Sequence, residues 1–357
     1  MCTKPPNIIL VMCDDLGYGD AGFNGNGVIR TPHLDRLCAA GTRLTRFQAG
    51  GPVCSPTRGT CLTGRHYLRY GIDHVGQGHL PEQEETLAPR LGSIGYRTGH
   101  FGKWHPGTFE HTRVPYGQHH IDHLPPQLDD RVVDRFSPPW ARGYQRGVAT
   151  ENTVPLWDPS RGFDSHSFAR TDEPYPTPYY IDGLPVREPV LGCDSAFIMD
   201  HALDFISDAA GAGEAFFTTI WFHAPHTPVE AGPAYLRLYR DFADELAHYF
   251  GCITAMDAQM GRLAAALQSL AIDQDTLIWF CSDKGDGRRH RQGAASPQSR
   301  QHRRPARAQT QPLQRWHHRA GFRPLARCRS GRQAVCRARQ HPRPVADGLL
   351  LPRPRPA

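Results

Sequence analysis

The sequence predicts an α/β fold in which helices flank a mostly parallel central sheet. Three continuous apolar runs, at 7–13, 215–222 and 276–281, are typical of strands buried on both faces. Stretches of helical period at 194–209 and 241–270 lie between the strands. A carboxylate or a histidine follows each run closely, and ligands of open α/β sheets gather at the carboxyl ends of strands. The 357 residues are enough for one large core or two.

The first strand ends at the adjacent carboxylates Asp14 and Asp15, before a glycine-rich turn. Two carboxylates directly after a buried strand are costly unless water or a cation neutralises them. A solvated turn explains one aspartate better than two. Further on, Thr31 and Pro32 are typical of the N-cap and first position of a helix over 31–37.

The stretch 54–65 reads Cys-Ser-Pro-Thr-Arg-Gly-Thr-Cys-Leu-Thr-Gly-Arg. Pro56 disfavours a mid-helix position for Cys54, and a helix starting after Pro56 would present backbone N–H groups to an anion. Arg58 adds a planar fork that suits a tetrahedral oxyanion. A buried structural cysteine is the usual alternative, but it does not explain why Pro56 and Arg58 occur with it.

Two further histidine-bearing stretches follow predicted strands. A short strand at 96–101 precedes Gly-Lys103-Trp-His105, and the run 215–222 precedes His223-Ala-Pro-His226. Lys103 and His105 would face one side if the strand continued, where they could hold anion oxygens. In isolation, a surface lysine and a packed or core histidine would be the better interpretation.

The other stretches carry weaker signals. Residues 80–91 predict a loop and then a helix, and 107–192 predict long loops with short elements that shape a substrate pocket. Four histidines within 111–123 lack metal-ligand spacing. The third strand ends in Ser-Asp283-Lys284-Gly.

The composition limits the class of protein. No run approaches the roughly 20 apolar residues that span a membrane, and no secretory signal is visible. We therefore expect a cytoplasmic protein as written, or a periplasmic or secreted one if the start is misplaced. The ten cysteines lack disulfide or zinc spacing, so we expect them mostly reduced.

The charge is unevenly distributed between two predicted domains, 1–286 and 287–357. The tail holds 18 arginines, no lysine and a single acidic residue, whereas the rest holds 23 basic and 34 acidic residues. Such a tail predicts disorder. Nucleic-acid binding is the rival interpretation, but the tail lacks lysine and interleaved aromatics. We interpret it as the product of a reading-frame shift, because residues 309–322 can be encoded by DNA whose neighbouring frame reads Lys-Arg-Ser-Leu-Tyr-Asn-Gly-Gly-Ile-Thr-Val-Pro-Gly-Phe.

The stretch 54–65 resembles the signature of the type I sulfatases, Cys-x-Pro-x-Arg followed by Leu-Thr-Gly-Arg. The tetrapeptide at 102–105 resembles their "GKWHLG" box, 223–226 their "HxPH" box, and 282–285 their "SDNG" or "SDHG". The resemblance covers roughly residues 5–286. It implies the α/β fold of the sulfatase and alkaline phosphatase superfamily, here lacking the C-terminal subdomain.

The resemblance also implies a mechanism. Cys54 would be oxidised to formylglycine by a formylglycine-generating or an anaerobic maturation enzyme, and its hydrate would attack sulfur. Arg58 and Lys103 would stabilise the transferring group. His226 would protonate the leaving alcohol and His105 would take a proton when sulfate is expelled. The implied Ca²⁺ ligands are Asp14, Asp15, the modified Cys54 and Asp283. Lys284 stands at the position of the usual Asn or His ligand, although an ammonium has no acceptor.

Three functions stay open at this point. The first is hydrolysis of a sulfate ester on a small molecule or glycan. The second is a catalytically impaired sulfatase remnant, because Lys284 and the tail depart from the family pattern. The third is a phosphate or phosphonate monoester hydrolase of the same superfamily.

Overall fold

The computed structural model describes residues 5–76, 78–111, 113–115, 132–164 and 169–285. All of them belong to one compact unit, Met1–Trp316, and the second unit, His317–Ala357, lies outside the described residues. The domain boundary expected at 286, and the predicted disorder and frame shift of the tail, also lie outside them.

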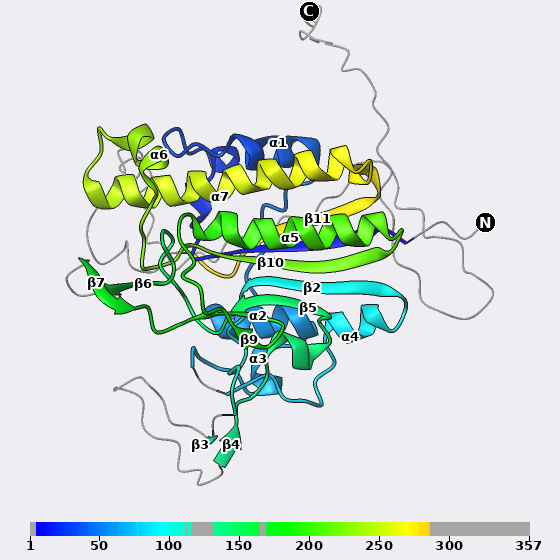
Figure 1. Cartoon of the computed structure of the whole chain (residues 1–357). Helices are drawn as coiled ribbons and strands as arrows, with labels where there is room; N and C mark the ends of the chain where they lie inside the picture. The colour runs from blue at the N-terminus through cyan, green and yellow to red at the C-terminus, as the bar shows by residue number, and fades with distance from the viewer. Residues whose placement is uncertain (1–4, 77, 112, 116–131, 165–168, 286–357) are drawn as a thin grey trace, which may run out of the picture. The chain divides into compact units, whose positions relative to one another are not determined.

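The core of the fold is a seven-stranded sheet (Figure 1). Its strands, in spatial order, are β11 (Thr276–Ser282), β1 (Asn7–Asp14), β10 (Ala215–Pro225), β2 (Tyr96–Lys103), β5 (Arg146–Thr150), β8 (Tyr179–Ile181) and β9 (Leu184–Pro185). The first five run parallel, and only the edge pair β8 and β9 is antiparallel. The predicted mostly parallel sheet is confirmed.

The three predicted apolar runs are the adjacent strands β11, β1 and β10, with β1 in the middle. Every residue of β10 is buried, in keeping with its continuous apolar sequence. This strand continues to Pro225, past the predicted end at residue 222. His223 therefore lies within the strand and not in the loop after it, where the sequence placed it.

Helices cover both faces of the sheet (Figure 1). On one face lie α1 (Pro32–Ala40), α5 (Asp194–Gly211) and α7 (Asp244–Ser269), and on the other α2 (Cys54–Thr63) and α4 (Leu87–Gly92). Successive residues of β1 point to opposite faces. Ile9 and Val11 join the core under α5 and α7, whereas Met12 joins a second core beside α2 and α4. The sheet thus separates two apolar cores.

The remaining elements are short. They are α3 (Tyr67–Tyr70), α6 (Pro233–Leu236), the hairpin strands β3 (Arg113–Pro115), β4 (Val132–Asp134), β6 (Arg161–Asp164) and β7 (Ala169–Pro174), and the 3₁₀ turns Tyr18–Asp20, Gly22–Asn24, Pro139–Arg142, Arg237–Tyr239 and Asp273–Asp275. Within the described part of the chain, no helix is both long and apolar enough to cross a membrane.

The N-terminus of α1 is held by a side chain from α7. Thr31 is the N-cap residue as predicted, but its hydroxyl makes no capping bond. Instead the carboxylate of Asp257 accepts hydrogen bonds from the backbone N–H groups of His33 (3.1 Å) and Leu34 (2.7 Å). Burial raises the pKa of Asp257 to about 6, despite these two bonds.

Candidate active site

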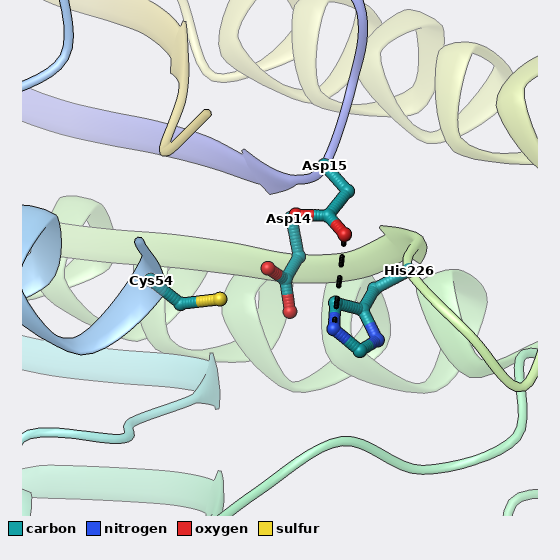
Figure 2. A group of neighbouring side chains, drawn as sticks. All are labelled: Asp14, Asp15, Cys54 and His226. Atoms are coloured by element: carbon teal, nitrogen blue, oxygen red, sulfur yellow. Dashed lines mark ion pairs between the residues drawn. The ribbon is translucent and has the colours of Figure 1, made fainter. Parts of the chain in front are cut away.

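Side chains from three distant segments meet beside the carboxyl end of the central strands (Figure 2). Asp14 and Asp15 stand at the end of β1, Cys54 begins α2, and His226 follows β10. One ligand atom from each of these four residues lies within 4.8 Å of the others. The convergence that the strand ends predicted is therefore present for these residues.

Cys54 is the first residue of α2, so the helix starts before Pro56 and not after it as the sequence suggested. Pro56 is tolerated because it falls in the first helical turn, where a backbone N–H has no intrahelical partner. The Cys54 side chain is buried, and burial raises the pKa of its thiol well above the ordinary value, with the charge of Asp14 adding to the effect. The unmodified thiol is therefore held in its neutral, weakly nucleophilic form.

Arg58 lies one helical turn further along α2 and is fully buried. Its guanidinium donates to the Asp283 carboxylate (3.0 Å) and to the backbone carbonyl of Lys103 (2.9 Å). Its Nη2 also lies 3.6 Å from Oδ1 of Asp14. The guanidinium packs over the Trp221 ring of β10, 5.1 Å from the ring centroid. One buried cation thus joins two carboxylates.

Lys103, the last residue of β2, forms a fully buried ion pair with Asp14. Its Nζ lies 2.5 Å from Oδ2 of that carboxylate. Burial by itself would raise the pKa of Asp14, but the charges of Lys103, His226 and Arg58 outweigh it. The pKa of Asp14 therefore lies well below its usual range.

Asp283 links the third strand to the first. Its Oδ1 accepts the backbone N–H of Asp15 at 3.2 Å, and its own N–H donates to the Cys13 carbonyl at 3.0 Å. Burial, and then the nearby charge of Asp14, raise the pKa of Asp283 to about 8. Asp15 itself has a positive φ of 68°, a conformation that is uncommon outside glycine, directly after the end of β1 at Asp14.

His105 reaches the same region by a different route from the one predicted. The strand β2 ends at Lys103, so the two side chains do not alternate along a continuing strand. His105 adopts a left-handed φ of 77° instead. Burial lowers its pKa strongly and the charge of Lys103 lowers it further. Its buried Nδ1 has no hydrogen-bond partner among the described residues, so a neutral, proton-accepting nitrogen is available there.

His226 faces Asp15 with its Nε2, 3.7 Å from Oδ2 (Figure 2). Its Nδ1 lies 2.6 Å from the carbonyl oxygen of Thr227, which fixes Nδ1 as the donor. Burial lowers the pKa of His226, although the Asp14 and Asp15 charges oppose this. At rest the imidazole is therefore biased toward its neutral form, with Nε2 able to accept a proton.

Lys284 contacts the second carboxylate of the pair. Its Nζ donates to Oδ1 of Asp15, and both side chains are largely buried. Burial acts to lower the pKa of Lys284, but the carboxyl groups beside it, Asp15 and Asp283, raise it above its ordinary value. The lysine is therefore a permanent cation in this position.

Sequence reasoning missed a polar chain inside the protein, next to the site. His223 is fully buried between Asp194 (Nδ1 to Oδ2, 3.0 Å) and Thr150 (Nε2 to Oγ1, 2.7 Å), and the hydroxyl of Tyr179 donates to Asp194 at 2.5 Å. The sequence places Asp194 at the start of a predicted helix, which could have marked it as a candidate. Its contact with His223 of β10, however, depends on the tertiary fold. Trp221 packs under Arg58, but the sequence predicts only that it belongs to a buried strand.

The chemistry of the donors fits a hard divalent cation such as Ca²⁺, which prefers oxygen ligands. Asp14, Asp15 and Asp283 offer carboxylate oxygens, and Oδ1 of Asp14 is buried without a hydrogen-bond partner among the described residues. The Cys54 sulfur is a soft ligand and suits Ca²⁺ poorly unless oxidation replaces it with oxygen. Lys284 cannot be a ligand because its ammonium has no lone pair.

The comparisons with known proteins show the family of the chain. The family model named Sulfatase matches residues 6–313, which extends beyond residue 286, where the motif resemblance ends. Bovine (Bos taurus) arylsulfatase A is 31% identical over 295 residues, covering 79% of this chain and 52% of the relative. The N-acetylgalactosamine-6-sulfatase of the dog (Canis lupus familiaris) is 28% identical over 294 residues, covering 79% and 50%.

A solved structure, Ps i-CgsB in complex with k-i-k-neocarrahexaose, matches with a TM-score of 0.64 and 26% identity, over 79% of this chain and 59% of that one. The chain spans about half the length of the curated relatives it matches. The family model covers most of this chain and includes every residue of the site. The chain therefore belongs to the sulfatase family.

Proposed function

We propose that this protein hydrolyses a sulfate ester carried by a small molecule or a carbohydrate. The observation that carries the proposal is the pair of buried cations, Arg58 and Lys103, that meet Asp14 beside Cys54. Cations fixed in a water-excluded site stabilise charge that develops on a transferring oxyanion. The names of the relatives, and the carbohydrate bound to Ps i-CgsB, support a sulfated carbohydrate as substrate class.

The nucleophile in this proposal is an oxidised Cys54 and not its thiol. Burial keeps the thiol pKa high, so a thiolate mechanism is disfavoured at neutral pH. A formylglycine at this position supplies, once hydrated, one hydroxyl to attack sulfur and a second to expel sulfate. Conversion of a thiol to an aldehyde is an oxidation, so the proposal needs a maturation enzyme and an oxidant that it uses.

The chain's own residues position the sulfate and move the protons. Arg58 and Lys103 hold the sulfate oxygens while their bonds to Asp283 and Asp14 keep both cations in place. His226, with Nε2 free, protonates the leaving alcohol once it has become charged. His105, neutral because of burial, accepts a proton through its unpartnered Nδ1 during release of sulfate.

Asp14, Asp15 and Asp283 would hold a divalent cation, proposed to be Ca²⁺. Such an ion acidifies a bound hydroxyl and screens the charge of the sulfate. Oδ1 of Asp14 supports this assignment, because it is buried and accepts no hydrogen bond among the described residues, and the Arg58 Nη2 that faces it lies 3.6 Å away, beyond hydrogen-bond distance.

Two measurements on the full chain test the proposal. Mass spectrometry of the peptide that contains Cys54 should find a loss of about 18 Da, from thiol to aldehyde, after co-expression with a maturation enzyme. The matured protein should then hydrolyse an aryl sulfate, and Cys54→Ala should abolish turnover. A matured protein that cleaves an aryl phosphonate but no sulfate would assign it to the other hydrolase class of the superfamily. A matured, folded protein that cleaves neither would be the impaired remnant.

A further inference from the structure

We infer that Lys284 acts as a tethered cation, which occupies Asp15 in place of a divalent metal ion and competes with it for the site. The contact that carries the inference is the one between Nζ of Lys284 and Oδ1 of Asp15. It places a permanent positive charge on one of the carboxylates that the proposed metal needs. The inference rests on the proposed function in one respect: it concerns the same carboxylates that are proposed to hold the metal ion.

The first argument is the balance of charge. The site contains three carboxylates and three permanent cations, namely Asp14, Asp15, Asp283, Arg58, Lys103 and Lys284. Each of the three acidic side chains has a cation as a close partner, so the cluster has no net negative charge for a metal ion to neutralise. The metal therefore gains little from neutralising unpaired charge, which is its usual contribution in a carboxylate site.

The second argument is that both cations cannot use the same oxygen. A divalent ion bound to Asp15 would share that carboxylate with the ammonium of Lys284. Two cations a few ångströms apart in a mostly buried site repel each other strongly, since water screens them poorly. Metal binding consequently requires Lys284 to leave, and its departure costs an ion pair.

The third argument is that Lys284 can leave, whereas Lys103 is fully enclosed. The Lys284 side chain is 18% exposed, whereas that of Lys103 is 0% exposed. A lysine side chain can swing its ammonium into solvent on its flexible stem. Lys284 therefore sets the metal affinity by competition and does not block the site permanently.

The test is calorimetric titration of CaCl₂ into the full chain after treatment with EDTA. Lys284→Met removes the charge and keeps the length, and should bind Ca²⁺ at least tenfold more tightly than the wild-type chain. Lys284→Asn adds an amide oxygen and should bind more tightly still. Lys284→Arg keeps the charge and should bind Ca²⁺ no better than wild type. It is the control for effects that a substitution at this position has on folding without loss of the charge. Arg240→Met, at an 82% exposed side chain, is the matched control for loss of one positive charge.

A second measurement uses thermal denaturation and needs no turnover. In EDTA, Lys284→Met should melt at a lower temperature than wild type because Asp15 loses its partner. Addition of CaCl₂ should then raise the melting temperature of Lys284→Met by more than it raises that of wild type. In an Asp15→Asn background the effect of Lys284→Met on Ca²⁺ affinity should disappear.

Equal Ca²⁺ affinity of wild type and Lys284→Met would overturn the inference, and so would the absence of binding in every variant. Neither result depends on catalysis. Tighter binding in Lys284→Met by a protein without sulfatase activity would support the inference and count against the proposed function. Equal binding by an active sulfatase would do the reverse.

Discussion

Arg58 is the residue on which the charge balance of the site depends most. It is enclosed completely, it bridges Asp14 and Asp283, and it packs on Trp221. Removing one partner of a buried ion pair leaves an uncompensated charge, which is far more costly than the pair is stabilising. Its value to the fold is therefore larger than its proposed role in holding sulfate alone would require.

Arg58→Met should lower the free energy of unfolding by about 3–5 kcal/mol. Urea denaturation followed by circular dichroism checks this. Arg240→Met, which removes an exposed arginine, should change it by less than about 0.5 kcal/mol. A loss for Arg58→Met no larger than that of the control would show that Asp14 and Asp283 find other partners.

His226 gives the activity of the matured protein a predicted pH dependence. Burial lowers the pKa of His226 below 6.5, so the charged form that can donate a proton is lost as pH rises through that lowered value. The kcat/KM for an alkyl sulfate, a poor leaving group, should therefore fall with rising pH and favour acidic conditions.

His226→Asn should reduce that rate by about 10²–10⁴-fold and remove the pH dependence. An aryl sulfate with a nitro group leaves without a proton, and it is the control substrate because its rate should change much less. Equal losses on both substrates would assign His226 a role other than proton donation.

At this scale the sequence predicted which residues meet but not how they are paired. Strand ends bring Asp14, His226 and Asp283 to one edge of the sheet, and that follows from the apolar runs alone. The partner of each group depends on side-chain positions. The sequence indicated that Lys284 is unsuited to bind a metal, but only the fold reveals that its ammonium reaches Asp15.

The helix α2 depends on a close approach that only a glycine permits. A Cβ added to Gly59 would lie 2.7 Å from the ring of Tyr70, whose hydroxyl donates to the carbonyl of Pro56 at 2.5 Å. Tyr70 thus holds the first turn of α2, which carries Cys54.

Gly59→Ala should therefore destabilise the protein by about 1–3 kcal/mol, as overpacking does, even though alanine favours helix. Gly211→Ala is the matched control, because Gly211 ends α5 and its Cβ would meet nothing within 4 Å. That change should stabilise by up to about 1 kcal/mol. Thermal denaturation of both variants checks the prediction, and a stabilised Gly59→Ala would contradict it.

The junction of α1 and α7 predicts a stability that depends on pH. Asp257 has a folded-state pKa of about 6, above the value of about 3.9 for an unfolded aspartate. A raised carboxyl pKa means that the folded state holds the proton more tightly. The contribution of Asp257 to the free energy of unfolding is therefore present below pH 4 and is lost as pH rises through 6.

The loss amounts to about 2 kcal/mol between pH 4 and pH 7, because part of the total of about 3 kcal/mol for two units of pKa difference is already lost at pH 4. Asp257→Asn removes the titration, so the free energy of unfolding of wild type relative to this variant should decrease over that interval. Urea denaturation of both proteins at pH 4, 5, 6 and 7 measures the difference. A pH-independent difference would place the pKa of Asp257 near its ordinary value.

Among the elements, long periodic segments were predicted well and short ones were not. The helices α5 and α7 and the central strands followed from patterns over six or more residues. The sequence predicts a loop region where β5 lies, because only Val148 and Ala149 of its residues Arg-Gly-Val-Ala-Thr are apolar. Its place in the sheet comes from pairing with β2, which is a tertiary contact.

At the scale of the whole chain, the family match and the composition of the tail remain to be reconciled. The family model reaches residue 313, into the arginine-rich sequence, while the chain spans about half of its curated relatives. We propose that a reading-frame shift near residues 285–300 produced the arginine-rich tail.

Sequencing of the gene tests this proposal. The DNA that encodes residues 309–322 should read, in the neighbouring frame, Lys-Arg-Ser-Leu-Tyr-Asn-Gly-Gly-Ile-Thr-Val-Pro-Gly-Phe. Because of codon degeneracy, many DNA sequences encode residues 309–322, and most of them do not encode this segment in the neighbouring frame. A gene sequence that lacks the segment in that frame would therefore reject the proposal. A chain restored to that frame should also give a higher melting temperature if the missing part packs against the sheet.

The position of β1 between β10 and β11 has a consequence for synthesis on the ribosome. The edge of β1 that pairs with β11 stays uncovered until Thr276 has been synthesised, 269 residues after its partner Asn7. At roughly 5–20 residues per second, that delay is on the order of 13–54 seconds. During this interval the nascent chain cannot complete its sheet or bring Asp283 to the site beside Cys54. If an enzyme oxidises Cys54 as proposed and needs an extended peptide, it would act while translation is still under way, and translation speed would then help to determine how many molecules are modified.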